Sequence, residues 1–418
     1  MFRIIYDALL FVFGVATLPK LIWNFCIHKK YRRSLAARVG LKIPNLPLKS
    51  GGSRIWIHAV SVGETRAVSS LLKKIQKEVP EASIFFSTTT ETGQEEARRL
   101  YPDLAGYFFL PLDFSWIIRR FVRLCDPHLL ILVESDFWYN IVTSVPQVVV
   151  VNGKMSVKSQ HRFQWVQFFT KRLFSPIHLF CLQSERYRDR FLSLGIDPQK
   201  LVVTGNLKFD TLPLHIDTTQ WRQTLGILPE DRVVTVGSTH ANEEEEILKV
   251  LEPLMAAFPH LKILIVPRHP ERFSSVAGML EKKGIAFSRY SEPQKMDPKS
   301  RVVLVDAMGV LSSCYQVSEL AIVGGSFVTH VGGHNIFEPA AFGVPVLFGP
   351  HMHTQKDLTQ LILQAEAGVE VTLDQLASTV YKYLQNPPLD MRQAGLQLAK
   401  EIHGATDRTW EALKPFLL

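Results

Sequence analysis

The sequence predicts an α/β fold that is built twice, as two Rossmann-like, doubly wound domains. Three observations predict this fold. The chain has 418 residues with 46% hydrophobic content, which is too long for a single ordinary core. After residue 54, short β-rich runs alternate with longer helical patterns. Several of the short runs are almost continuously apolar, as expected for parallel strands that are covered on both faces.

The short runs that predict strands occur in both halves of the chain. The first half contains RIWIHAV (54–60), SIFFSTTT (83–90), GYFFLPL (106–112), LLILVES (129–135), QVVVVNG (147–153), LFCLQS (179–184) and LVVTGN (201–206). The second half contains RVVTVGS (232–238), KILIVPR (262–268), RVVLVDA (301–307), LAIVGGS (320–326) and VPVLFGP (344–350). Each half therefore supplies the strands of its own sheet.

We predict the domain boundary in FDTLPLHIDTTQ, residues 209–220, because Pro and polar residues interrupt the strand–helix alternation there. The predicted organisation is an anchor over residues 1–28, a first domain over 29–210 and a second domain over 211–418. The second domain includes the helices expected from about Thr372 to the C-terminus. If the two domains face each other across a cleft, the loops at the carboxyl ends of both sheets line it.

The N-terminal segment differs from the rest of the chain in charge and hydropathy. Residues 1–54 hold ten Lys or Arg and one acid, Asp7, so their net charge is +9 while the whole chain carries +8. The apolar run ALLFVFGVATL (8–18) precedes PKLIWNFCI and the cluster HKKYRR. Trp23 and the cationic cluster suit the headgroup level of a membrane, and cations after the run keep the following domains on the cytoplasmic side.

Several alternatives remain open for this segment. The apolar run is shorter than the ~20 residues that cross a bilayer as a helix, so the anchor either spans or lies in the interface. A cleaved signal peptide is the second reading, although only Arg3 precedes the run and a dense basic stretch follows it. A buried first helix with a solvated basic tail is the third.

Cysteine spacing and missing motifs exclude several kinds of chemistry. The four cysteines, Cys26, Cys125, Cys181 and Cys314, lie far apart and form no CxxC pair, which favours reduced thiols in a cytoplasmic protein. The sequence has no GxSxG, GxxxxGK or HExxH motif, so it gives no support to a serine hydrolase, a P-loop enzyme or a zincin. It also lacks a DxD pair, so we expect no metal site for sugar transfer.

The second half carries the most distinctive loop, GGSFVTHVGGHNIFEPAAFGVPVLFGP (324–350). A Gly-rich turn there leads into the helical pattern NIFEPAAFG, and the start of such a helix offers free N–H groups to a phosphate. Asn335 is suited to cap the helix, and Glu338 to accept hydrogen bonds from ribose hydroxyls. A plain Gly-rich turn with a solvated glutamate is the competing reading.

Further polar groups follow other predicted strands. In the second half, VPRHPER (266–272) supplies Arg268 and His269 as cations for a phosphate, and DAMGVL (306–311) and GSTHANEEEE (237–246) occupy two more strand ends. The four consecutive glutamates are expected at a helix N-terminus. In the first half the strand ends carry Glu64 in VGE, the TTTETG turn (88–93), Asp113, Glu134 and Lys208. Each alone is more often a solvated or capping residue, but together they describe an acidic and basic site.

Ten motifs in this order resemble the Kdo transferases, which move 3-deoxy-D-manno-octulosonic acid (Kdo) from CMP-Kdo onto a lipid A precursor. The motifs are IWIHAVSVGET, TTTETGQEEA, PLD, VESDFWYN, VNGKMS, GNLKFD, GSTHANEE, VPRHPER, DAMG and GGHNIFEP. The resemblance runs from the N-terminal segment to about residue 350. It implies a GT-B fold and an inverting transfer without a metal or other cofactor.

The resemblance also implies roles for particular residues. It makes Glu64 the general base and Glu134 and Lys208 stabilisers of the transition state. An ammonium such as that of Lys208 can offset charge on the departing CMP phosphate. The stretches that resemble CMP contacts are Pro267, Arg268 and His269; Met308, Gly309 and Val310; and Asn335, Ile336, Phe337 and Glu338.

The resemblance further implies partners and a location. The partners are CMP-Kdo, a lipid A precursor and the cytoplasmic surface of the cell inner membrane, with no nucleic acid, and the oligomeric state is left open. A basic N-terminal region would attract an acceptor that carries anionic phosphates.

Two departures from the family pattern keep other functions open. Val310 stands where the family commonly has a glutamate, and VESDFWYN differs from the usual ETE(I/L)WPN at Ser135, Asp136 and Tyr139. One alternative is another GT-B enzyme that uses a UDP-sugar, either a lipid-linked transferase or an epimerase. The other alternative is a membrane-surface binding protein without catalysis, which Val310 favours.

Overall fold

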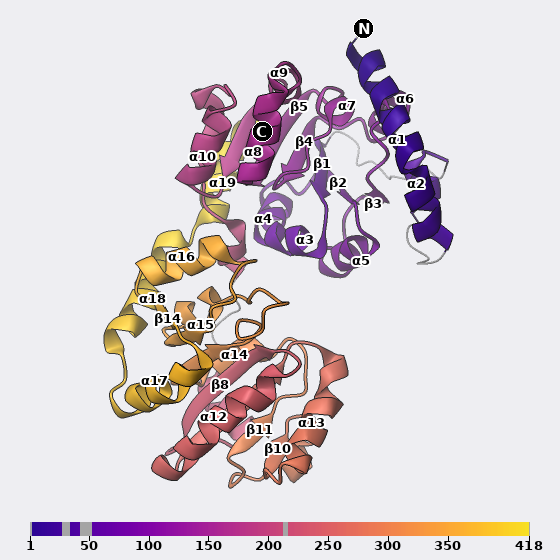
Figure 1. Ribbon diagram of the computed structural model, residues 1–418. Helices are drawn as coiled ribbons and strands as arrows, with labels where there is room; N and C mark the ends of the chain where they lie inside the picture. Colours follow the sequence, from indigo (N-terminus) through magenta and orange to yellow (C-terminus); the bar gives the residue numbers. More distant parts are fainter. Residues whose placement is uncertain (1, 27–33, 42–51, 212–215, 418) are drawn as a thin grey trace. The chain divides into compact units, whose positions relative to one another are not determined.

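The computed structural model describes residues 2–26, 34–41, 52–211 and 216–417, and the chain divides into two compact units (Figure 1). Unit 1 consists of Met1–Thr211 and Ile402–Leu418, and unit 2 of Leu212–Glu401. Each unit is built on one seven-stranded parallel sheet. The predicted α/β fold with two Rossmann-like domains is confirmed.

The sheet of unit 1 has the strand order β3-β2-β1-β4-β5-β6-β7. In register, Ile57 of β1 lies opposite Phe86 of β2 and Ile131 of β4. The order reverses beside β1, so the loops after β1 and β4 open at the topological switch point where α/β sheets bind ligands. The strands are β1 (Arg54–Ala59), β2 (Ser83–Thr88), β3 (Gly106–Phe109), β4 (Leu129–Val133), β5 (Gln147–Gly153), β6 (Leu179–Leu182) and β7 (Leu201–Val203).

Helices cover both faces of this sheet. Successive residues of a strand point to opposite faces, and accordingly Trp56 belongs to one core cluster while Ile55 and Ile57 belong to the other. The helices are α1 (Phe2–Cys26), α2 (Leu35–Arg38), α3 (Val62–Ala67), α4 (Ser69–Glu78), α5 (Glu91–Leu100), α6 (Ser115–Cys125), α7 (Tyr139–Val142), α8 (Val157–Trp165), α9 (Gln167–Phe174), α10 (Glu185–Leu192) and α19 (Ala405–Leu417), with the 3₁₀ turns η1 (Pro198–Lys200) and η2 (Leu207–Thr211).

Unit 2 repeats the design with the strand order β10-β11-β9-β8-β12-β13-β14. Its strands are β8 (Arg232–Thr239), β9 (Leu261–Pro267), β10 (Phe287–Arg289), β11 (Val302–Leu304), β12 (Leu320–Val323), β13 (Val346–Phe348) and β14 (Gly368–Glu370). The three-residue edge strands β10 and β14 were not predicted. The helices are α11 (Thr218–Thr224), α12 (Glu243–Ala257), α13 (Phe273–Lys282), α14 (Leu311–Gln316), α15 (Phe337–Ala341), α16 (Lys356–Gln364), α17 (Leu373–Gln385) and α18 (Leu389–Ile402), with η3 (Pro270–Arg272) and η4 (Pro293–Lys295).

The C-terminal helix α19 corrects the predicted range of the second domain, 211–418, because residues 402–418 belong to unit 1. Trp410, Leu413 and Leu417 are buried in the core cluster that also holds Leu71 and Ile75 of α4. The carboxylate of Asp210 fixes the helix start by accepting hydrogen bonds from the Gly404 and Thr406 N–H groups. An apolar face that packs on a helix some 330 residues earlier in the chain cannot be recognised from local sequence.

Helix α1 is the only described helix that is long and apolar enough to span a membrane, by length and composition (Figure 1). Its first two turns pack on unit 1: Phe2 and Tyr6 contact Tyr139 and Phe169, and Asp7 accepts hydrogen bonds from the Ser115 N–H and the Asn140 side chain. Farther along, the consecutive residues Phe11, Val12 and Phe13 are each more than 60% exposed. The helix therefore keeps one partly covered face, which continues through Leu10, Gly14 and Thr17, and leaves the rest of its apolar surface exposed.

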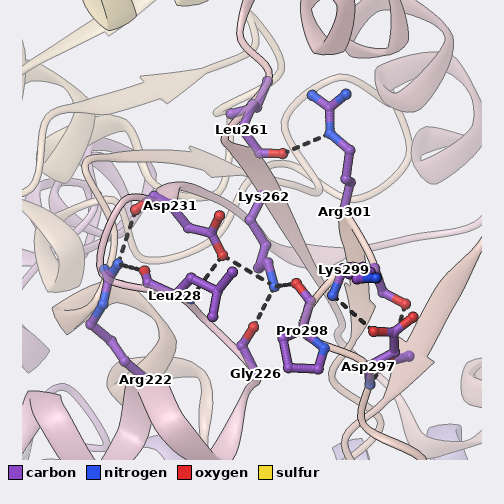
Figure 2. Close-up of polar contacts among 12 residues, drawn as sticks. Arg222, Gly226, Leu228, Asp231, Leu261, Lys262, Asp297, Pro298, Lys299 and Arg301 are labelled. Carbon is purple, nitrogen blue, oxygen red and sulfur yellow. Dashed lines mark hydrogen bonds and ion pairs between the residues drawn. The ribbon is translucent and has the colours of Figure 1, made fainter.

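At the amino end of the sheet in unit 2, β9 buries a lysine, Lys262, among apolar residues (Figure 2). Its ammonium donates hydrogen bonds to the carbonyls of Gly226 and Pro298, and it lies 3.2 Å from Oδ2 of Asp231. The same Asp231 oxygen also accepts the Leu228 N–H at 2.9 Å. A buried charge needs such complete pairing, and its place away from the carboxyl ends of the strands indicates a structural role.

Candidate active site

Two glutamates lie at the carboxyl ends of β1 and β4, the neighbouring strands at the switch point of the sheet in unit 1. Glu64 lies in the first turn of α3, just after β1, and Glu134 follows β4 directly. β1 and β4 are neighbours in the sheet, so the fold brings together two carboxylates that are 70 residues apart in sequence. Both are among the residues that the sequence singled out.

Glu64 is half-buried, and its carboxylate turns back toward the strand end. Its Oε2 accepts a hydrogen bond from the N–H of Val60, the residue directly after β1. Burial raises the pKa of Glu64, and the negative charge of Glu134 raises it further, against the opposing effect of the Val60 hydrogen bond. A carboxylate with a raised pKa is a stronger base than an ordinary glutamate.

Glu134 is almost fully buried, and two lysines hold it. Its Oε1 lies 2.9 Å from the Lys208 ammonium and its Oε2 lies 2.5 Å from the Lys154 ammonium. Burial disfavours the charged carboxylate, but the two ammonium groups outweigh burial and lower the pKa of Glu134. The two lysines are about two-fifths exposed, so the group presents positive charge toward solvent with the carboxylate beneath it.

An unusual backbone conformation sets the direction of the Glu134 and Asn152 side chains. Glu134 and Asn152 adopt left-handed φ values of 67° and 54°, which cost about 1 kcal/mol or more in a non-glycine residue. Asn152 compensates by donating from Nδ2 to Glu134 Oε1 at 3.4 Å and accepting the Leu207 N–H at 3.0 Å. It therefore ties the loop after β4 to the turn that carries Lys208.

A second polar network links the loop after β4 to β1 and β2. The buried His58 contacts Asp136 Oδ2 through Nε2 at 3.0 Å and Ser87 Oγ through Nδ1 at 2.9 Å. The other carboxylate oxygen of Asp136 accepts the Trp138 Nε1–H at 3.0 Å. Asp136, one of the departures from the family pattern, therefore holds the segment around Glu134 in place.

Asp113 and the TTTETG turn have structural roles in unit 1. The Asp113 carboxylate accepts the N–H groups of Asn140 and Ile141 at 2.9 Å each, so it caps the short helix α7, and burial raises its pKa to about 7. Thr90 of the turn caps α5 by accepting the Gly93 N–H at 3.1 Å. These are the capping roles that the sequence left open for them.

In unit 2 the Gly-rich loop follows β12 and is closely packed. Gly325, Gly332 and Gly333 have φ values of 66°, 94° and 84°, and a Cβ on Gly333 would collide with Met352. The helix that follows, α15, has only five residues, because Pro339 and Gly343 shorten the expected pattern NIFEPAAFG. A helix this short contributes little dipole, so the expected phosphate site depends on the loop N–H groups and nearby cations instead.

The predicted contacts on this loop differ in accessibility. Asn335 is exposed, and its Oδ1 accepts the Phe337 N–H at 3.1 Å from one position before the N-cap, which is Ile336 rather than the predicted Asn335. Ile336 and Phe337 are buried in the core, so only their backbone is available to a ligand. Glu338 is half-buried, and burial raises its pKa.

Two of the four consecutive glutamates at the start of α12 hold the loops in place. Glu243 accepts the N–H groups of His240, Gly325 and Phe327 at 2.7–3.1 Å. Glu244 accepts from Thr239 Oγ1 at 3.1 Å and pairs with Arg272 at 2.9 Å. The predicted helix N-terminus is confirmed, although these two side chains are buried rather than solvated.

Cations collect at the carboxyl ends of β8 and β9. Arg268 and His269 follow β9 and are exposed, whereas Pro267 is buried within the strand. The ring of His240, after β8, lies edge-on to His269 with centroids 5.3 Å apart and parallel to His334 of the Gly-rich loop with centroids 5.0 Å apart. Met308 and Gly309 are also exposed, and Val310 packs against a core cluster, so no polar side chain replaces the glutamate that the family commonly has there.

Comparison with known proteins gives the family. A family model described as 3-Deoxy-D-manno-octulosonic-acid transferase (kdotransferase) matches residues 33–211. A 3-deoxy-D-manno-octulosonic acid transferase of Chlamydophila psittaci is 36% identical over 99% of this chain and 96% of its own length. The chain belongs to the Kdo transferase family. It is therefore a glycosyltransferase. A 3-deoxy-D-manno-octulosonic acid transferase of Haemophilus influenzae is also 36% identical, over 93% of this chain and 92% of the relative.

Solved structures of other enzymes show the fold of both units of this chain. The crystal structure of a UDP-GlcNAc 2-epimerase from Neisseria meningitidis has a TM-score of 0.61 and covers 86% of this chain and 99% of its own. At 12% identity the similarity shows the fold alone, which is GT-B as predicted. The relatives therefore favour the predicted transferase over the epimerase alternative.

Four site residues of this Kdo transferase were not singled out from the sequence. Lys154, His58, His240 and His334 all lie within quoted motifs, VNGKMS, IWIHAVSVGET, GSTHANEE and GGHNIFEP. Lys154 and His240 closely follow predicted strands, His58 lies inside one, and His334 lies in the Gly-rich loop, so strand ends were an available signal only for the first two. Their partners lie on other strands, so the pairing becomes visible only in the folded chain.

Proposed function

We propose that this Kdo transferase moves Kdo from CMP-Kdo to a lipid A precursor by an inverting displacement that needs no metal. In this reaction Glu64 takes the proton of the attacking acceptor hydroxyl, and the hydroxyl oxygen displaces CMP from the anomeric carbon. The observation that carries the proposal is the pairing of a half-buried carboxylate of raised pKa with a neighbouring carboxylate that two lysines neutralise.

The charges that develop during this reaction match the charges of Glu64, Lys208 and Glu134. The acceptor hydroxyl becomes more acidic as it attacks, so the nearby Glu64 carboxylate has a proton to accept. The departing phosphate gains negative charge, which the Lys208 ammonium offsets. Glu134 holds that ammonium at 2.9 Å and is itself placed to favour positive charge that develops on the sugar.

The donor half of the proposal rests on the cations and the loop of unit 2. Arg268, His269 and the N–H groups of the Gly-rich loop bind the CMP phosphate, and Asn335 and Glu338 contact the nucleoside. Ile336, Phe337, Met308, Gly309 and Val310 contribute backbone groups or apolar contact, and Pro267 shapes the loop. CMP and UDP differ in the base and in the number of phosphates, so a binding comparison separates this donor from a UDP-sugar.

The decisive experiment measures transfer from CMP-Kdo, generated in situ, to a tetraacylated lipid A precursor in detergent with chelator present. We expect product from the intact chain and a loss of about 10²- to 10⁴-fold in kcat for Glu64→Gln, with CMP binding retained. Glu78→Gln, an exposed glutamate on α4, is the matched control and should transfer normally. Full activity of Glu64→Gln would refute the assignment of the base, and a requirement for a divalent metal would refute the metal-free step.

We also propose that α1 anchors the catalytic units to the cytoplasmic surface of the inner membrane. The support is an apolar helix whose residues 11–13 are each more than 60% exposed, together with the basic N-terminal sequence. Replacing Phe11, Val12 and Phe13 by serine leaves the packed residues of the first two turns in place. We expect the variant to move from the membrane to the soluble fraction, whereas Leu389→Ser, an exposed leucine of unit 2, should not. An unchanged distribution of the triple variant would refute the anchor.

A further inference from the structure

His240 and His334 form a pair whose chemistry the phosphate site does not use. The two Nε2 atoms lie 2.7 Å apart, so one ring donates its Nε2–H to the Nε2 of the other. Within the described part of the chain this is the only hydrogen bond recorded for either imidazole. The outer nitrogens of both rings are therefore available to a ligand.

The surroundings of the pair are cationic. Arg268 and His269 approach from the loop after β9, Arg272 from η3, and His330 from the Gly-rich loop. The nearby carboxylates are engaged elsewhere: Glu243 with three backbone N–H groups and Glu244 with Arg272. Glu271 lies 4.0 Å from the His269 ring and on the exposed surface. Arg272 and His269 thus face carboxylates of their own, whereas His240, His334 and Arg268 form no ion pair with a carboxylate among the described residues.

A Kdo donor has two anionic groups close together. Kdo is a 2-keto sugar acid, so its anomeric carbon carries both the C1 carboxylate and, in the donor, the oxygen of the CMP phosphate. A phosphate held by Arg268 and His269 would place the carboxylate one carbon away. The His240 ring, whose centroid lies 5.3 Å from that of His269, is at the matching separation.

We propose that His240 and His334 bind the C1 carboxylate of the donor sugar and take up a proton when it binds. This inference rests on the proposed function and adds to it a subsite for the sugar acid, separate from the nucleotide contacts. Without an anion, burial and the neighbouring cations lower the pKa of both imidazoles to about 4, so at neutral pH the pair has one shared proton and no net charge. A bound carboxylate supplies the missing negative charge and favours the imidazolium form.

The test compares the donor with CMP, which has the phosphate but not the carboxylate. The KM for CMP-Kdo and the inhibition constant of CMP are measured for the intact chain and for His240→Gln and His334→Gln. We expect each variant to raise the KM about tenfold or more, the usual effect of losing a hydrogen bond to a charged group, and to change the CMP constant less than twofold. Arg268→Gln should weaken both ligands, and His260→Gln, an exposed histidine remote from the loops, should weaken neither.

A second measurement is the pH dependence of the KM for CMP-Kdo. The KM of the intact chain for CMP-Kdo should fall as the pH is lowered from 8 to 6, because binding takes up a proton, and His334→Gln should lose this dependence. Equal weakening of CMP and CMP-Kdo, or a KM that the substitutions leave unchanged, would overturn the carboxylate subsite while leaving the proposed transfer intact. Absence of transfer by the intact chain would overturn both.

Discussion

The two units share one sheet design but handle charge in opposite ways at the carboxyl ends of their strands. In unit 1 the buried Glu134 is neutralised by Lys154 and Lys208 before any substrate arrives. In unit 2 the histidine pair and Arg268 lie together without a described carboxylate to balance them. The difference shows that one sheet design can carry compensated charge at its strand ends in one copy and uncompensated positive charge in the other.

The largest expected effect concerns the buried ion pair of Lys262 and Asp231, which is the compensated charge of unit 2. Removing one partner of a buried ion pair costs about 3–5 kcal/mol, so Lys262→Met should lower the free energy of unfolding of unit 2 by an amount of that order. The KM values should not change, because Lys262 lies away from the loops. Chemical denaturation measures the effect, with the exposed Lys299→Met as control. Adding Asp231→Asn should restore much of the stability, and failure to do so would show that Asp231 is not the relevant partner.

In unit 1 the question is whether both lysines serve the reaction or only compensate Glu134. We expect Lys208→Met to lower kcat about 10²- to 10³-fold, as for loss of a donor that stabilises transition-state charge, and Lys154→Met to lower it less. Both variants disturb the same carboxylate, so the difference between them isolates catalysis from stability. Single-turnover transfer rates provide the measurement, with Lys77→Met as the exposed control. Equal losses would mean that the lysines act only through Glu134.

The pH profile tests the coupling between the two glutamates. Glu64 must be ionised to accept a proton, so activity falls as the pH drops through its pKa, which burial and Glu134 raise. Glu134→Gln removes a negative neighbour and should move this acid limb to lower pH, by about one unit or less. Lys154→Met should move it to higher pH, because Glu134 is then less compensated. Shifts of the same sign in both variants would rule out the coupling.

As the pH falls below neutral, unit 2 should lose stability before unit 1 does. The pKa of His240 and of His334 lies near 4 in the folded chain, below the ~6.5 of an unfolded histidine, so stability is lost as the pH falls from 6.5 toward 4. In unit 1 the folded Asp113 has a pKa of about 7, so it takes up its proton over the same range and unit 1 gains stability. Hydrogen exchange of the full chain at pH 7 and pH 5, corrected for the pH dependence of intrinsic amide exchange, should show lower protection at pH 5 in unit 2 only. Parallel changes in both units would contradict this sign.

The fold was largely predictable, and the site only in part. Apolar runs identified twelve of the strands, because buried parallel strands leave that pattern, whereas the edge strands β10 (FSR) and β14 (GVE) mix apolar with polar or glycine residues and leave none. Strand ends pointed to Glu64, Glu134, Lys208 and Arg268. The partners of these residues depend on backbone turns such as the left-handed φ of Glu134, Asn152 and Ser238, which local sequence does not specify.

The return of the chain to unit 1 at its C-terminus has a consequence for synthesis. Residues 405–417 leave the ribosome after residues 1–211 of unit 1 and all of unit 2, so the hydrophobic face formed by α4 stays uncovered until then. Unit 2, residues 212–401, is by contrast contiguous and is made in full before that point. The half that emerges first is thus the half that finishes folding last, and a nonsense codon anywhere after residue 401 would spare unit 2 while leaving the half that carries Glu64 incomplete.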